Sequence, residues 1–136
     1  MKPNPEKVDC ISLLVCDDVY RDEITKKLIL VGAFSCINAV RLPCQHPRIS
    51  VHFTLTNARG KYDLALYIEN EKSGTRVVEL RGPLEINDPL LISDTNVELR
   101  NIVFHESGKY WVTVEADGAI LAQRPFWVQV QTEVKP

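Results

Sequence analysis

The chain has 136 residues, of which 45% are hydrophobic and 25% charged, with a formal net charge of −2 at pH 7. These values are typical of one soluble globular domain with a single core and exclude a disordered chain. Acidic and basic residues are interspersed without a basic stripe, which disfavours binding to nucleic acid or to an anionic membrane surface.

The first residues predict a flexible N-terminal arm over residues 1–8. A single β-sandwich domain is expected over 9–131 and a C-terminal tail over 132–136. The apolar run from Cys10 to Cys16 is too short for a membrane helix and follows acidic residues, so we expect no signal peptide and no membrane segment. The expected location is therefore cytoplasmic.

Apolar and polar residues alternate with period two through almost the whole chain, and turn residues interrupt the pattern about every eight to twelve positions. This predicts an all-β, antiparallel, immunoglobulin-like sandwich of two sheets with seven or eight strands. A closed barrel is less favoured because the loops are long enough for Greek-key connections. The predicted strands are 9–17, 27–40, 48–57, 61–71, 75–86, 95–104 and the two arms of a final hairpin within 109–130.

Individual strands predict further detail. The stretch 27–40 is apolar on both faces, which indicates a central strand of its sheet. The stretch 87–94 is expected to connect the strands on either side of it, with a crossing from one sheet to the other left open. In the predicted strands 48–57 and 61–71, the residues expected to face the core are Ile49, Val51, Phe53, Leu55, Tyr62, Leu64, Leu66 and Ile68.

The final hairpin carries the most specific predictions. Asp117-Gly118 fits a two-residue type I′ turn, which needs positive φ at both positions. Without a correction this register would bury two glutamines, so we expect a β-bulge near Arg124-Pro125. The bulge would return Phe126, Val128 and Val130, which alternate along the second arm, to the core.

The same register sets Trp111 and Trp127 on the outer face as diagonal neighbours, flanked by Lys109 and Arg124. Three interpretations of this pair remain open. A loop or the N-terminal arm could cover the rings, the rings could form a protein–protein or self-association patch, or they could stack on a sugar.

The cysteines are Cys10, Cys16, Cys36 and Cys44, and none of them forms a C-x-x-C pair. We expect reduced, buried thiols, because free cysteine is among the most buried residue types. A zinc site from Cys36, Cys44 and His46 would lack the usual close ligand spacing. No cofactor is expected.

No catalytic motif is present: the sequence has no G-x-S-x-G, no glycine-rich phosphate loop and no H-E-x-x-H. His46, His52 and His105 lie far apart, and each is expected to be solvated or structurally hydrogen-bonded. His105-Glu106 could orient a proton-transfer pair but has no nucleophile nearby. We therefore expect no enzymatic activity and assign no catalytic residue.

The stretch 15–27, VCDDVYRDEITKK, concentrates four acidic residues. A calcium site would need Asp17, Asp18 and Asp22 to meet Asp88 or Asp94 across two loops, and the EF-hand spacing is absent. The alternative is a solvated hairpin tip in which side chains of this stretch bond backbone amides of the turn. The tip is the favoured interpretation.

A set of turn and strand motifs runs through the chain: Cys16, Asp17, Val19, Asp22, Thr25, Lys27, Leu30, Gly32 and Phe34, with the stretches 46–48, 98–104 and 108–128. With these motifs the chain resembles an uncharacterised bacterial family of small β-sandwich proteins, a domain of unknown function, over residues 10–130. The resemblance implies the fold and supplies no substrate, cofactor or catalytic residue. One departure is Lys26, where the family pattern leads us to expect glycine.

The expected function is that of a non-enzymatic module that presents the Trp111 and Trp127 face to another protein or to a second copy of the chain. The alternative is a ligand-binding sandwich, with carbohydrate on the tryptophans or calcium at the acidic tips.

Overall fold

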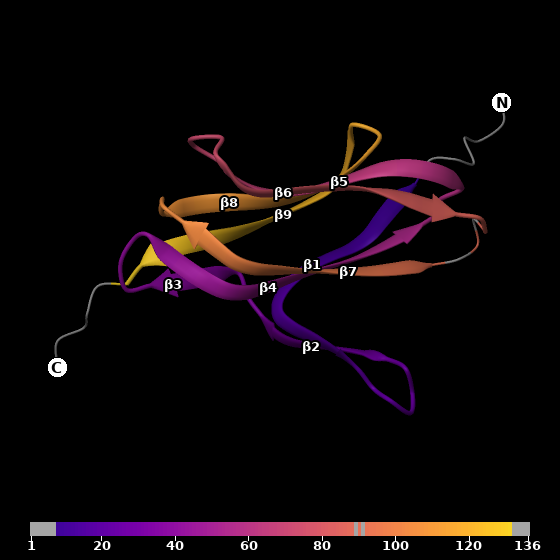
Figure 1. Cartoon of the computed structure of the whole chain (residues 1–136), viewed down its shortest axis with the longest axis horizontal. Helices are drawn as coiled ribbons and strands as arrows, with labels where there is room; N and C mark the ends of the chain where they lie inside the picture. The colour runs from indigo at the N-terminus through magenta and orange to yellow at the C-terminus, as the bar shows by residue number, and fades with distance from the viewer. Residues whose placement is uncertain (1–7, 89, 91, 132–136) are drawn as a thin grey trace.

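The fold is a sandwich of two facing sheets (Figure 1), seen in a computed structural model that describes residues 8–88, 90 and 92–131. The four-stranded sheet has the order β2-β1-β4-β7 and the five-stranded sheet the order β3-β9-β8-β5-β6. The described strands are β1 (Asp9–Arg21), β2 (Leu28–Ala33), β3 (Cys36–Ala39), β4 (Cys44–Thr56), β5 (Gly60–Asn70), β6 (Arg76–Ile86), β7 (Ser93–Phe104), β8 (Gly108–Ala116) and β9 (Ala119–Val130).

The predicted two-sheet, all-β, immunoglobulin-like architecture is confirmed. The described residues form nine strands instead of seven or eight, because the stretch 27–40 divides into β2 and β3. The connection over 87–94 leaves β6 in one sheet and enters β7 in the other, so it does cross between the sheets. No helix within the described ranges has the length and apolarity that crossing a membrane requires.

The prediction that 27–40 forms a central strand was wrong. β2 is an edge of the four-stranded sheet, and β3 is an edge of the five-stranded sheet, where it runs parallel to β9. Between them the Phe34 ring turns into the core and meets Phe126 edge-on, with 5.9 Å between the ring centroids. The apolar residues on both faces therefore reflect a chain that changes sheets, and not a strand buried on both sides.

An aromatic cluster fills one end of the core. The rings of Tyr110 and Phe126 are stacked with centroids 5.7 Å apart, and Phe104 meets Tyr110 edge-on at 5.1 Å. Such aromatic pairs add stabilisation beyond that of the buried area. The predicted inward-facing residues of β4 and β5 all belong to the core or pack against it.

The outer face of β4 is also buried, which alternation alone did not indicate. Ser50, His52 and Thr54 are each less than 8% exposed. β4 lies between β1 and β7 in its sheet. The Thr54 hydroxyl donates to Asp94 Oδ1 at 2.9 Å, and His52 Nε2 lies 3.6 Å from the same oxygen.

The type I′ turn of the final hairpin is confirmed by φ values of 50° at Asp117 and 83° at Gly118. The bulge exists, but it lies next to the turn: Val114 pairs with Ala122, which leaves Leu121 as the extra residue. Pro125 needs no bulge of its own. The nitrogen of Pro125 points to the same side of β9 as the Trp127 N–H, which donates to the Ser35 oxygen just before β3. Because β3 pairs with β9 only from Trp127 onward, no partner strand lies beside Pro125 on that side, and no ladder hydrogen bond is lost there.

The shifted bulge still brings Phe126 and Val128 into the core, as predicted. Val130 follows the same alternation but is 45% exposed, because it lies at the end of the sheet. At the other end of the chain Val8 is buried, although the sequence placed it in the flexible arm. The rest of the predicted arm, 1–7, and the tail, 132–136, lie outside the described residues.

All four cysteines are free thiols, but only Cys16 is fully buried. Burial, followed by the Asp17 and Asp18 carboxylates, raises the pKa of the Cys16 thiol.

We predict that a short pulse of N-ethylmaleimide at pH 7.5 labels the half-buried Cys36 well before Cys16, because the thiolate is the reactive form. Peptide mass mapping measures the order, and equal rates in native protein would contradict this placement. Unfolding in guanidinium should abolish the difference.

Candidate functional site

The outer face of β8 and β9 brings the two tryptophans together, as the sequence predicted. Trp111 lies opposite Pro125, and Trp127 lies opposite Lys109 on the neighbouring strand. The inward partners between them, Tyr110 and Phe126, fix this orientation, because successive residues of a strand point to opposite faces. We call Trp111, Lys109 and Trp127 the tryptophan patch.

The three side chains of the tryptophan patch are in contact. The Lys109 ammonium nitrogen lies 4.8 Å from the centroid of the Trp111 ring and 6.0 Å from that of Trp127. These distances are those of cation–π interactions. Trp111 Nε1 donates to Glu71 Oε1 at 3.1 Å, so the turn after β5 covers part of Trp111. Trp127 stays 46% exposed.

Arg124 does not belong to the tryptophan patch, which corrects the sequence-based prediction. It lies opposite the inward-facing Val112, and its Nη1 donates to the backbone oxygen of Leu13 in the other sheet at 3.4 Å. The reason is the position of the bulge: because Leu121 is the extra residue, Arg124 is already shifted to the inner face.

An ordered polar network adjoins the patch on the same outer face. The Arg76 guanidinium lies 3.7 Å from the centroid of the Tyr67 ring, and the Tyr67 hydroxyl donates to Glu115. Burial and the Glu115 carboxylate raise the pKa of Tyr67. Gln123 Nε2 donates to the buried hydroxyl of Thr113 at 3.1 Å. The patch therefore has a hydrogen-bonded polar border on one side.

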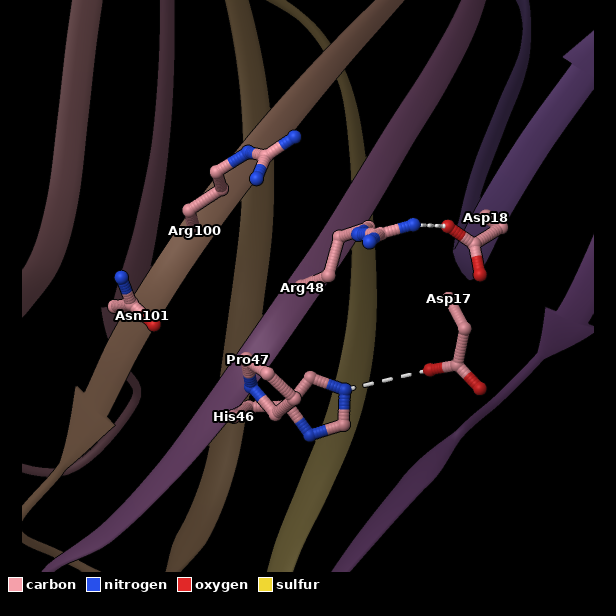
Figure 2. Close-up of a pocket in the computed structure, with 7 residues that line it drawn as sticks. All are labelled: Asp17, Asp18, His46, Pro47, Arg48, Arg100 and Asn101. Atoms are coloured by element: carbon pink, nitrogen blue, oxygen red, sulfur yellow. Dashed lines mark hydrogen bonds and ion pairs between the residues drawn. The ribbon is translucent and has the colours of Figure 1, made fainter.

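A second feature, which the sequence reasoning missed, is a hollow of about 520 Å³ on the other sheet (Figure 2). It lies where the end of β1 passes β4 and β7. The side chains in it come from separate strands and meet only in the folded chain. They are Asp17, Asp18, His46, Pro47, Arg48, Arg100 and Asn101.

The hollow lies at a paired irregularity of β4 and β7. In a regular strand one outward-facing residue separates two inward-facing ones. In β4 two exposed residues separate Ile49 from His46, and in β7 two exposed residues separate Leu99 from Ile102. Asn101, with φ of 54°, stands at this point of β7. Both strands thus reverse their alternation together, and the register of their pairing is the same on either side of this point.

Ion pairs join the three strands around the hollow. His46 Nε2 lies 3.3 Å from Asp17 Oδ1, and Arg48 bonds Asp18 and lies 3.1 Å from Glu98 Oε1. The hydrogen bond that Arg48 donates to the Asp18 carboxylate raises the pKa of Arg48. Figure 2 shows Asp17 and Asp18 facing His46 and Arg48 across the gap between β1 and β4. The contact joins residues about 30 positions apart, and nothing in the spacing of C-D-D at 16–18 and H-P-R at 46–48 indicates it.

The lining of the hollow brings an Asp–His pair together but supplies no hydroxyl, thiol or amine that the pair could activate as a nucleophile. Among the described residues no group of three or more His, Cys, Asp and Glu side chains could hold a metal ion. The zinc and calcium ligand sets considered from the sequence are therefore not assembled there. The arrangement as described joins β1 to β4 and β7.

The acidic stretch ends in a hairpin tip, as favoured from the sequence. Asp22 Oδ1 accepts hydrogen bonds from the amides of Ile24 and Thr25 at 2.8 and 2.7 Å, and these bonds lower the pKa of Asp22. Thr25 Oγ1 accepts from the Lys27 amide at 3.3 Å. Lys26 has φ of 65°, so this position does adopt the left-handed conformation that glycine would adopt more easily.

The fold and the side-chain arrangement place the protein among immunoglobulin-like β-sandwiches. Its sequence matches the model of a family of unknown function, DUF6941, over residues 11–129. The chain belongs to this family, in agreement with the resemblance noted from its motifs. A comparison with curated protein sequences gives no significant match.

Two solved structures are similar to the chain at low sequence identity. An alkylpurine DNA glycosylase from Pseudomonas fluorescens, bound to DNA containing an abasic site analogue, is 16% identical over 92% of this chain, with a TM-score of 0.57. This chain spans 31% of the glycosylase's length, and at this identity the likeness extends to the fold alone. An immunoglobulin-like protein from Pseudomonas aeruginosa is 13% identical over 93% of this chain and 100% of its own length, with a TM-score of 0.49.

Gly32 allows Asp17 to reach the hollow. A Cβ at Gly32, where φ is 72°, would lie 2.5 Å from Asp17 Oδ2. We predict that Gly32→Ala lowers the free energy of unfolding by about 2 kcal/mol, of which about 1 kcal/mol comes from backbone strain. Denaturant unfolding measures it.

Gly74→Ala is the matched control, because φ is 74° there and the nearest atom to a Cβ is 3.7 Å away. It should lose only the strain, about 1 kcal/mol. In an Asp17→Ala background, which keeps a Cβ 3.2 Å from that of residue 32, the loss for Gly32→Ala should fall toward the control value. An equal loss for Gly32→Ala with and without Asp17 would show that the carboxylate is not displaced.

Proposed function

We propose that the domain is a non-enzymatic, cytoplasmic interaction module that presents the tryptophan patch to another protein or to a second copy of the chain. The single observation that carries this proposal is the exposure of Trp127 beside Lys109 and Trp111 on the outer face of the five-stranded sheet. The cytoplasmic setting agrees with four free cysteines and no disulfide among the described residues.

The chemistry of the patch supports a protein partner. Tryptophan is enriched among the residues that contribute most to binding energy at interfaces, and it works there when a polar border excludes water. Here the ordered side chains of Tyr67, Arg76 and Glu115 provide such a border. The Lys109 ammonium places a positive charge at the centre of the patch, so a partner with a carboxylate beside an apolar side chain would complement it.

Carbohydrate stacked on the tryptophans is the alternative ligand. It fits less well, because the Lys109 ammonium already lies over the Trp111 ring and because Glu71 holds that ring at its indole nitrogen. Calcium at the acidic tips is the other alternative. Asp22 is engaged with backbone amides of its own turn, and Asp94 lies at Thr54 in another part of the sheet.

The experiment is affinity capture with three baits: the wild type, Trp111→Ala/Trp127→Ala, and the control Leu80→Ala, which removes an exposed apolar side chain from β6. We expect a partner held by the wild type and by Leu80→Ala to bind at least about 100-fold more weakly to the double variant, as measured with the purified partner. Equal retention on all three baits would remove the patch as the binding surface.

Intrinsic fluorescence gives an independent measurement, because the chain has only these two tryptophans. Binding at the patch should shift the emission to shorter wavelength and reduce quenching by acrylamide. A partner that binds without changing either property contacts another surface and contradicts the proposal. Titration with soluble oligosaccharides and with millimolar calcium tests the alternatives: a saturable emission change with sugar, or a rise in Tm with calcium, would favour them.

A further inference from the structure

The β1–β2 hairpin extends beyond the sandwich as a two-stranded ribbon (Figure 1). β1 makes its last pair with β4 at Cys16 and Ser50, and from there to Arg21 it pairs with β2 alone. A two-stranded ribbon by itself is at best marginally stable in water.

β2 contributes apolar side chains to both faces of the ribbon, whereas β1 sets Asp18 opposite Val31 and Arg21 opposite Leu28. On one face Tyr20 lies opposite Ile29, with Val31 two residues further along β2, and these side chains are 54%, 48% and 44% exposed. On the other face Leu28 and Leu30 are half-buried. Exposed apolar side chains gathered in this way mark an interaction surface more often than isolated ones do.

β2 is also the least protected edge strand of the molecule. Charged residues and proline prevent edge strands from pairing with other chains, and β6 and β7 carry them: Arg76, Glu79, Arg81, Pro83 and Glu85 on β6, and Asp94, Glu98 and Arg100 on β7. β3 is only four residues long. β2, LILVGA, has neither charge nor proline, and its outer edge has no strand partner in the described part of the chain.

We propose that β2 pairs antiparallel with β2 of a second copy, about a two-fold axis through Leu30, to join the two four-stranded sheets into one. In this register Ile29 of each copy lies opposite Val31 of the other, so the apolar face that begins at Tyr20 continues across the junction. A two-fold interface requires a surface that complements itself. In the proposed register β2 meets this requirement, because its aliphatic side chains face aliphatic side chains of the other copy.

Charge also favours a second copy as the occupant. The strand begins after Lys26 and Lys27, and its other end lies under Asp17, whose carboxylate stands directly over Gly32 and whose side chain is 53% exposed. Antiparallel pairing sets the basic start of each strand beside the acidic end of the other. Both contacts are repeated by the symmetry. A parallel arrangement would instead bring like charges together.

This inference is independent of the tryptophan patch, which lies on the five-stranded sheet.

The dimer is tested by measuring the molar mass of the protein by light scattering at micromolar to millimolar concentration. We expect twice the 15.4 kDa of one chain for the wild type. Ile29→Lys should weaken dimerisation at least about 100-fold, since the symmetry places one lysine from each copy in the interface. Because Ile29 is exposed in the single chain, its circular dichroism and Tm should stay close to wild type.

Two control variants separate this surface from others. Ile120→Lys changes an exposed isoleucine near the β8–β9 turn, and Trp111→Ala/Trp127→Ala changes the patch. Both should remain dimers. A wild type that is monomeric at every concentration, or an Ile29→Lys variant that dimerises as the wild type does, would overturn the proposal. Loss of the dimer in the tryptophan variant alone would assign it to the patch instead.

A cysteine at position 30 tests the register. Residues facing each other across a two-fold axis between antiparallel strands have Cα atoms about 4.5–5.5 Å apart, within the range of a disulfide. Leu30→Cys should therefore form a disulfide-linked dimer on mild oxidation. Leu28→Cys and the wild type, with its own four cysteines, should not. Crosslinking of Leu28→Cys without Leu30→Cys would contradict this pairing.

Discussion

The contact between Phe34 and Phe126 is the constraint on which much of the structure depends. Phe34 lies where the chain leaves one sheet for the other, and its ring packs edge-on against Phe126 in the aromatic end of the core. Because that ring turns inward, β2 ends on one sheet and β3 begins on the other. The centroid of the same ring lies 5.6 Å from that of the His46 ring, and His46 pairs with Asp17.

The motifs shared with the family have structural roles at this crossing. Asp17 reaches His46 because Gly32 has no side chain at the point that its carboxylate occupies. Asp22 holds the hairpin tip through two backbone amides. A run of acids that suggested a calcium site is thus explained by a strand end, a close approach and a turn, of which the last two require a particular residue type.

The two proposed surfaces lie on different sheets and differ in chemistry. The tryptophan patch is aromatic, carries a cation and is bordered by ordered polar side chains. The β2 edge offers backbone donors and acceptors between aliphatic side chains. Pairing of backbone edges suits a second copy with matching strand geometry, whereas an aromatic patch selects for side-chain chemistry. A sandwich that dimerises through one sheet would keep both copies of the other sheet's patch available.

The sequence by itself determined what depends on neighbours along the chain. Alternation placed Ile49, Val51, Phe53 and Leu55 in the core, and Asp117-Gly118 specified its turn, because side-chain period and turn geometry are local properties. Only the tertiary structure decided which sheet each half of 27–40 joins, which face Arg124 occupies and that Asp17 meets His46. These depend on a ring buried by a distant strand, on a bulge one residue long, and on two strands reversing their alternation together, none of which leaves a periodic signal in the sequence.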